Sequence, residues 1–150
     1  MNLPRLVASG FGSGLVRTAP GTAGSFVALL LGAGMLTWAP PALPLAAVAA
    51  YFAGIWAVRA CRAEHDPGWV VIDEFAGQWI AMLALASPTP LGLAAAFLLF
   101  RLLDIVKPGP VKLAERQGGA LGVMNDDVVA GGLAALLIWA ARGAWPGILD

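Results

Sequence analysis

Long apolar stretches separated by short polar clusters dominate the pattern of this chain. No charged residue occurs from Thr18 to Val58 or from Phe75 to Phe100. Uncharged apolar stretches of about 18 residues or more are typical of helices that cross a membrane. We therefore predict an all-α fold, a polytopic membrane helical bundle with about five short transmembrane helices. Their apolar segments cover roughly residues 24–38, 43–58, 75–86, 91–103 and 128–141.

Prolines mark the breaks between these segments, because proline ends a helix and biases the preceding residue away from helical geometry. Pro40 and Pro41 separate the first two segments, and Ser87-Pro88-Thr89-Pro90 separates the third from the fourth. A single kinked helix across residues 75–103 would place Asp73 and Asp104 on opposite sides of the membrane. Two helices joined by a tight turn would return both to the same side. The two closely spaced prolines favour the turn.

Composition supports the membrane prediction and limits the alternatives. The chain has 150 residues, of which 59% are hydrophobic and 12% charged, and its mean hydropathy is +0.80. Soluble domains carry about 25% charged residues. This length predicts one membrane-embedded domain over residues 1–150. The net charge of zero gives no electrostatic case for binding nucleic acid, and the single Cys61 excludes an internal disulfide.

Basic residues are distributed asymmetrically in the five-helix arrangement. Eight of the nine lysines and arginines lie on one side, and Arg142 alone lies near the other. An excess of basic residues marks the cytoplasmic side of a membrane protein. We therefore predict a cytoplasmic N-terminus and an external C-terminus. Eight of the nine acidic residues share the cytoplasmic side, so any chemistry they perform should face the cytoplasm.

Three polar clusters interrupt the apolar pattern: Asp73-Glu74, Arg101-x-x-Asp104-x-x-Lys107 and Asp126-Asp127. A carboxylate at the edge of an apolar helix is costly unless it is solvated, paired or bound to a cation. Adjacent carboxylates repel each other, and a divalent metal ion would hold them together. One alternative is that the acidic pairs cap the helices that they begin. Another is that Arg101, Asp104 and Lys107, which share a helical face, form an ion pair at the membrane boundary.

A glycine-rich segment precedes the first long apolar stretch. It comprises residues 10–14 and 20–25, and it lacks the lysine of a nucleotide-binding P-loop. Such a turn at a helix N-terminus can offer backbone N–H groups to an anion. Alternatively, it is a flexible loop with Thr22 as the helix cap. The only histidine, His65, is expected to be solvated in a loop, since no zinc motif surrounds it.

Taken in order, these motifs resemble the phosphatidylglycerophosphatase A family of bacterial inner-membrane lipid phosphatases. The similar stretches span residues 11–14 with 19–25, 73–77, 100–108 and 122–131, and together they extend over nearly the whole chain. Two positions differ from the family pattern: Gly109 stands in place of a tryptophan, and Asn125 in place of an apolar residue. Neither change affects a carboxylate.

The resemblance implies Mg²⁺-dependent hydrolysis of phosphatidylglycerophosphate to phosphatidylglycerol and inorganic phosphate, the last step of phosphatidylglycerol synthesis, at the cytoplasmic face of the bacterial inner membrane. We expect the metal ligands to come from Glu74, Asp104, Asp126 and Asp127. We expect the catalytic residues to be Asp73, Asp127 and Lys107, with Asp73 acting as the general base toward a metal-bound water or, alternatively, as the nucleophile itself. We expect substrate phosphate to be held by Arg101 and Lys107, with a weaker contribution from Thr22, Ser25 and Gly21.

Other functions fit parts of the pattern. A cation-coupled transporter or channel also carries acidic residues within its helices, but these should lie near the middle of the membrane. A non-catalytic membrane subunit would not need arginine and lysine beside the acids. A phosphotransferase that acts on other lipid head groups would use similar residues. Assays of several lipid phosphates, with and without magnesium, would distinguish these functions.

Overall fold

The computed structural model describes residues 2–147 and 149, and within this part of the chain it contains helices and no strand. The helices are α1 (Leu3–Ala8), the 3₁₀ helix η1 (Ser13–Leu15), α2 (Pro20–Trp38), α3 (Ala42–Ala60), α4 (Ile72–Met82), α5 (Pro90–Val106), α6 (Gly109–Glu115) and α7 (Gly119–Ala144). Three of them, α2, α3 and α7, are long and apolar enough to cross a membrane. The predicted all-α membrane fold is confirmed, and the five predicted segments correspond to α2, α3, α4, α5 and α7.

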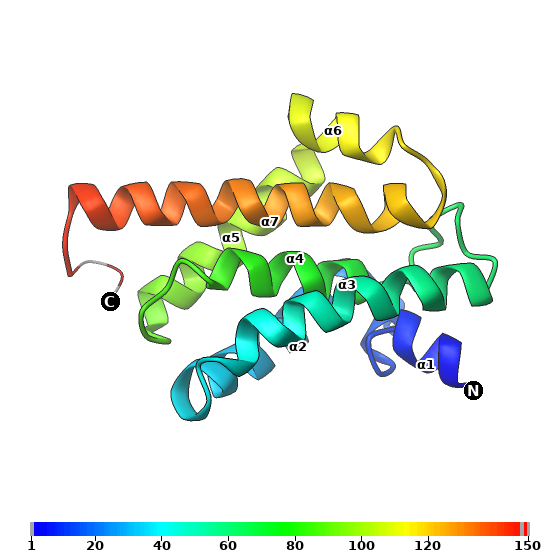
Figure 1. The fold of residues 1–150 in the computed structure, drawn as a ribbon, viewed down its shortest axis with the longest axis horizontal. Coiled ribbons are helices and arrows are strands. Elements are labelled where there is room, and N and C mark those ends of the chain that lie inside the picture. The colour runs from blue at the N-terminus through cyan, green and yellow to red at the C-terminus, as the bar shows by residue number, and fades with distance from the viewer. Residues whose placement is uncertain (1, 148, 150) are drawn as a thin grey trace.

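The connections between helices alternate between the two ends of the bundle. At one end lie the α2–α3 turn, the α4–α5 turn and the last turn of α7, and at the other lie α1 and the α3–α4 connection (Figure 1). The predicted turn at residues 87–90 is therefore confirmed. Its geometry follows from local chemistry, because Pro90 begins α5 and the Thr89 hydroxyl accepts the Gly92 N–H at 3.1 Å.

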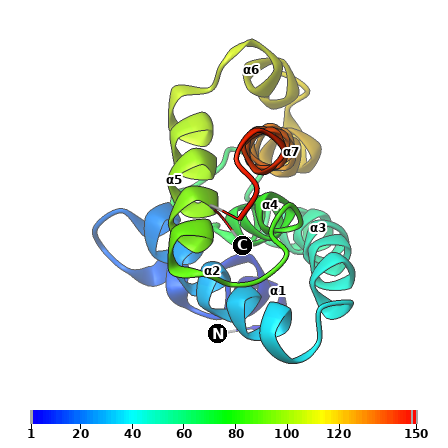
Figure 2. The same cartoon turned by 90° about the vertical axis from the view of Figure 1, so that its left-hand side faces the viewer.

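Helix α4 lies at the centre of the bundle, although it has only eleven residues. Viewed along the bundle, it is surrounded by α2, α3, α5 and α7 (Figure 2). Nine of its residues are buried. A helix of this length spans only about 16 Å, well short of a bilayer of about 30 Å. Its neighbours therefore cover it from lipid, and it positions the residues at its N-terminus deep inside the protein.

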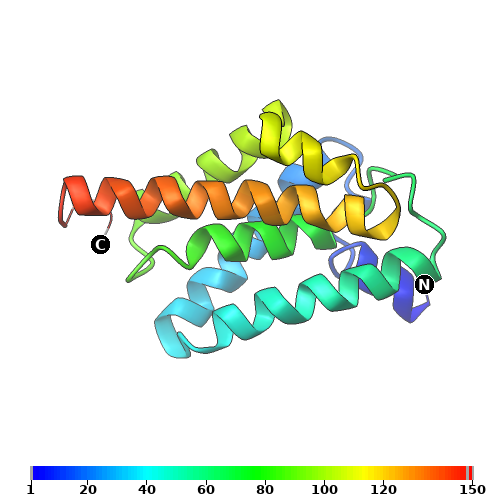
Figure 3. The same cartoon turned by 45° about the horizontal axis from the view of Figure 1, so that its top comes forward.

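Helices α4 and α7 run side by side and meet with their backbones in contact (Figure 3). A Cβ atom added to Gly131 on α7 would overlap the carbonyl oxygen of Gly77 on α4. On the other side of α4, the Trp79 indole N–H donates to the Ala28 carbonyl of α2 at 2.8 Å. Small residues that allow close backbone approach are typical of helix packing in membranes.

One of the two acidic pairs lies at a different place in its helix from the one that the sequence predicts. Helix α7 begins at Gly119, so Asp126 and Asp127 lie about two turns inside it and cannot cap its N-terminus. The prediction that this pair begins a helix is wrong, because Gly118 and Gly119, both with positive φ, provide the start. Helix α4 does begin at the first acidic pair, with Val71 as its N-cap residue.

Candidate active site

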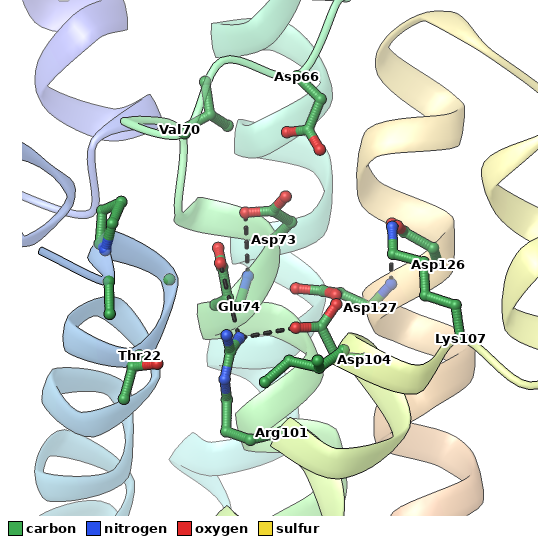
Figure 4. Close-up of a pocket in the computed structure, with 15 residues that line it drawn as sticks. Thr22, Asp66, Val70, Asp73, Glu74, Arg101, Asp104, Lys107, Asp126 and Asp127 are labelled. Carbon is green, nitrogen blue, oxygen red and sulfur yellow. Dashed lines mark hydrogen bonds and ion pairs between the residues drawn. The ribbon is translucent and has the colours of Figure 1, made fainter.

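The acidic clusters meet in one cavity of about 390 Å³. It lies where the N-termini of α2 and α4 approach the C-terminal end of α5 and the first half of α7 (Figure 4). Its lining residues are Ala19, Pro20, Gly21, Thr22, Asp66, Gly68, Val70, Asp73, Glu74, Arg101, Asp104, Ile105, Lys107, Asp126 and Asp127. All five predicted carboxylates are therefore brought together, although they are separated by up to 54 positions in the sequence (from Asp73 to Asp127).

The five carboxylates form two overlapping groups. One oxygen atom from each of Asp73, Glu74 and Asp127 can lie within 4.8 Å of the others, and the same is true of Asp104, Asp126 and Asp127. Asp127 belongs to both groups. Asp73, Asp126 and Asp127 are also buried, with exposed fractions of 6%, 4% and 3%. Buried like charges at this separation are strongly unfavourable without nearby positive charge.

Arg101 supplies part of that positive charge and connects three helices. Its Nη1 atom lies 2.8 Å from an oxygen of Asp104 on the same helix and 3.7 Å from an oxygen of Glu74 on α4. The same nitrogen donates to the Ser25 hydroxyl of α2 at 3.3 Å. Ser25 is itself fully buried, donates to the Gly21 carbonyl at 2.8 Å and does not line the cavity. The structure therefore places Ser25 behind Arg101, where it orients the guanidinium group.

Lys107 lines the cavity from a position just after the last residue of α5. It is the C-cap residue of this helix and has left-handed backbone geometry, with φ of 48°. The expectation that it shares one helical face with Arg101 and Asp104 is wrong, because the helix ends before it. Its Nζ atom donates to Asp126 and to Glu115 of α6, at 2.6 Å each. Burial lowers the pKa of Lys107, but these hydrogen bonds and charges raise it more, so the pKa lies above its ordinary value and the amine stays charged.

The N-terminus of α2 forms one wall of the cavity through Gly21 and Thr22. A Cβ atom on Gly21 would overlap the Glu74 carboxylate, so any larger residue here would displace the acid from the end of α2. Thr22 does not cap α2, since the N-cap residue is Ala19. The glycines in the first part of the glycine-rich segment have a packing role. Gly10 and Gly14 pack against Val71 and do not line the cavity.

Several lining residues were not singled out by the sequence, among them Asp66 and Ile105. Asp66, in the loop before α4, adds a sixth carboxylate, and Ile105 adds an exposed apolar side chain at the edge. No sequence signal identified either residue, because a loop acid and an apolar helical residue are both common. Although Asp66 is exposed on one side, the surrounding protein removes part of its hydration and raises the pKa of its carboxyl, while the nearby Lys107 ammonium opposes the increase.

The charged side chains that line the cavity favour the binding of a cation. Six carboxylates line it together with two basic side chains, Arg101 and Lys107, which leaves an excess of four negative charges if all the acids are ionised. Every carboxylate offers hard oxygen donors of the kind that Mg²⁺ prefers. One oxygen of Glu74, Oε2, is buried and has no hydrogen-bond partner among the described residues. The residues present therefore fit a divalent cation with oxygen ligands.

Comparisons with known proteins agree with this site. The family profile for phosphatidylglycerophosphatase A matches residues 6–142. A protein of Bacteroides thetaiotaomicron, whose name proposes a phosphatidylinositol-3-phosphatase activity, is 42% identical over 93% of this chain and 94% of its own length. Proteins named phosphatidylglycerophosphatase A are each 37% identical: that of Escherichia coli over 97% of this chain and 87% of its own length, and that of Haemophilus influenzae over 95% and 90%.

Comparison with solved structures found no significant match. The family match extends over most of the chain and includes every acidic residue of the cavity. The chain therefore belongs to the phosphatidylglycerophosphatase A family and is a phosphoric monoester hydrolase.

Proposed function

We propose that this protein hydrolyses phosphatidylglycerophosphate to phosphatidylglycerol and inorganic phosphate, in a Mg²⁺-dependent reaction that completes phosphatidylglycerol synthesis. The observation that carries the proposal is the charge balance of the cavity, in which six carboxylates accompany two basic residues. A phosphomonoester carries almost two negative charges near neutral pH. It would be repelled from this cavity unless a cation accompanied it, so the acids and the anionic substrate both favour a bound divalent metal.

The metal ligands in this proposal are Glu74, Asp104, Asp126 and Asp127. Mg²⁺ held there would neutralise part of the acidic charge and polarise the phosphoryl oxygens. The two carboxylate groups that share Asp127 support this ligand set. They also place Asp73 within reach of the same region, so Asp73 is the fifth candidate oxygen donor.

The basic residues would bind the substrate phosphate. Arg101 presents a planar guanidinium group at the cavity, and its position is fixed by Ser25 and Asp104. A guanidinium group can donate two parallel hydrogen bonds to phosphate oxygens. Lys107 remains charged and lines the cavity, so it can stabilise negative charge that develops on the leaving glycerol oxygen as the P–O bond breaks. Thr22 and the first turn of α2 add hydroxyl and N–H donors at the opposite wall.

Asp73 is the proposed proton acceptor. One of its oxygens, Oδ1, accepts the Glu74 N–H at 3.1 Å, which orients the carboxylate. The other oxygen is then able to accept a proton from the water that attacks phosphorus. The water oxygen would form the new P–O bond as the bond from phosphorus to the glycerol oxygen breaks. The water proton would pass to Asp73, and the leaving glycerol oxygen would take a proton from solvent.

The geometry favours an enzyme over a transporter. Asp73 and Glu74 lie in the first turn of α4, and Asp104 lies near the last residue of α5. The cavity therefore opens at helix ends rather than along a path through the bundle. We further propose that this end faces the cytoplasm of a bacterium, with the protein in the inner membrane, because the basic residues of the chain are concentrated there. Labelling of a cysteine at residue 89, in a variant without Cys61, from the external side alone would support this orientation. Labelling from the cytoplasmic side alone would contradict it.

The substrate is tested by measuring phosphate release from purified protein with a panel of lipid phosphates in mixed micelles. The panel contains phosphatidylglycerophosphate and phosphatidylinositol 3-phosphate, the second because of the name of the Bacteroides relative. We expect the highest kcat/KM for phosphatidylglycerophosphate. A higher kcat/KM for the inositol lipid would replace the proposed substrate while leaving the reaction class unchanged.

A further inference from the structure

The edge of the cavity has two chemically different parts. On one part lie Asp66 and Gly68, both exposed, from the loop that precedes α4. On the other lie Thr22 of α2 and Ile105 of α5, and the Ile105 side chain is 68% exposed. The cavity therefore opens toward a polar loop and toward the outer surface of two helices. An edge of this kind suits a ligand with a charged head and an apolar body.

The apolar part of the edge continues along α2. Phe26 lies one turn beyond Thr22 on the same helical face, and Leu30 lies one turn beyond Phe26. Phe26 and Leu30 are 51% and 57% exposed. The eight residue-to-residue steps of helix from Thr22 to Leu30 extend the surface by about 12 Å from the cavity.

A matching surface runs along α5. Leu98, Leu102 and Ile105 recur at intervals of four and three residues, so they share one face of the helix, and all three are more than half exposed. The two helices are in contact beside these faces, where the rings of Phe26 and Phe97 meet edge to face with centroids 6.2 Å apart. This contact brings the half-exposed Phe26 of α2 against α5.

We propose that this surface, formed by Phe26, Leu30, Leu98, Leu102 and Ile105, binds the acyl chains of the lipid whose phosphate occupies the cavity. The inference rests on the proposed function, and it adds the direction from which the lipid approaches. We identify acyl chains as the ligand of this surface because Ile105 belongs both to the apolar surface and to the lining of the charged cavity. One molecule with a phosphate head and apolar chains would occupy both. A diacyl lipid phosphate enters sideways from the membrane between α2 and α5, with its phosphate at Arg101 and its chains along the two helices.

Another apolar surface of the protein provides the comparison. Pro44, Val48 and Phe52 of α3 line a separate cavity of about 300 Å³, which shares no lining residue with the acidic cavity. Phe52 is 64% exposed, similar to Phe26. The proposal therefore predicts that lipid contacts on α3 do not depend on the head group in the acidic cavity.

Photocrosslinking in vesicles tests the proposal directly. The probe is phosphatidylglycerophosphate with a diazirine on one acyl chain, added to wild-type protein with or without an excess of unlabelled phosphatidylglycerophosphate. We expect labelling of residues 26–30 and 98–105 that decreases when the unlabelled lipid is present, and labelling of residues 48–52 that does not. Competition-sensitive labelling on α3 or α7, with none on α2 and α5, would overturn the inference.

A kinetic comparison provides an independent measurement. We compare the kcat/KM of a long-chain substrate with that of its water-soluble dibutyroyl analogue in Leu102→Trp and in the matched control Phe52→Trp. The ratio of long-chain to short-chain kcat/KM should fall about tenfold in Leu102→Trp and remain at the wild-type value in Phe52→Trp. An unchanged ratio in both variants would contradict the proposed surface. Failure of wild-type protein to hydrolyse either substrate would instead contradict the proposed function.

Discussion

The Asp127→Asn substitution tests whether the acidic cluster binds a metal ion or has only a structural role. Asp127 belongs to both carboxylate groups, in each of which ligand oxygens lie within 4.8 Å of one another. Two unit charges 4.8 Å apart repel each other by about 3 kcal/mol at an effective dielectric constant of about 20. Asparagine has nearly the same shape and no charge, so it removes this repulsion toward four neighbouring carboxylates while preserving the packing.

The two accounts predict opposite combinations of activity and stability for Asp127→Asn. If the carboxylate binds Mg²⁺, turnover at limiting Mg²⁺ should fall by about 100-fold or more, because loss of a residue that merely supports a metal ligand already costs roughly 10–100-fold. The melting temperature in the presence of a chelator should stay the same or rise, since less like charge remains buried. A structural role would instead lower the melting temperature and leave turnover per folded molecule unchanged.

The assay combines phosphate release over a magnesium titration with thermal unfolding in detergent. Glu64→Gln is the matched control, because Glu64 is an exposed acid that does not line the cavity. The control should show wild-type turnover at every Mg²⁺ concentration. Near-normal turnover of both Asp127→Asn and Asp104→Asn at limiting Mg²⁺ would refute the ligand assignment.

Three further substitutions test individual residues. Arg101→Lys should reduce kcat/KM by about tenfold or more in the phosphate-release assay, because lysine keeps the charge but lacks the planar fork that binds phosphate; wild-type kinetics would indicate that Arg101 serves only as an ion pair with Asp104. Asp73→Asn should lower kcat by about 100-fold with little change in Mg²⁺ affinity, whereas a helix-terminal role alone would reduce stability by about 1 kcal/mol and spare turnover. Gln78→Met should raise the melting temperature by a few degrees. Gln78 is fully buried and neither polar atom of its side-chain amide has a hydrogen-bond partner among the described residues, which costs about 1–3 kcal/mol of stability for each atom. A lower melting temperature would contradict this reasoning.

The positions of the long helices could be read from the sequence because charge and proline leave clear signals in an apolar chain. The end of α4 could not be predicted from the sequence. The apolar run continues past Met82 to Ala86 without a polar residue, yet the helix stops at Met82. The Ala84 carbonyl in the following turn accepts a hydrogen bond from Arg142 at the end of α7, at 2.6 Å. This contact joins residues 58 positions apart, so no local pattern could reveal it.

The carboxylates of the site could also be predicted, because unpaired acids are rare in apolar helices. The basic residues with which these carboxylates pair could not be predicted, because the fold determines which side chains meet. Lys107 pairs with Asp126 and Glu115 since its left-handed backbone turns the chain out of α5. Asp66 reaches the cavity only through the loop between α3 and α4. The sequence thus identified the charged groups in and next to the long helices and missed Asp66, which a loop contributes to the cavity.

The most direct test of the proposed function is phosphate release from phosphatidylglycerophosphate by purified wild-type protein, first with a chelator and then with increasing Mg²⁺. If all six acids of the cavity are ionised, their excess of four negative charges would repel an anionic substrate unless a cation binds with it. The account predicts no measurable release with the chelator, and release that rises with Mg²⁺ to a plateau. Equal release with chelator and with Mg²⁺ would contradict the central claim that this acidic cavity is a metal-dependent lipid phosphatase site.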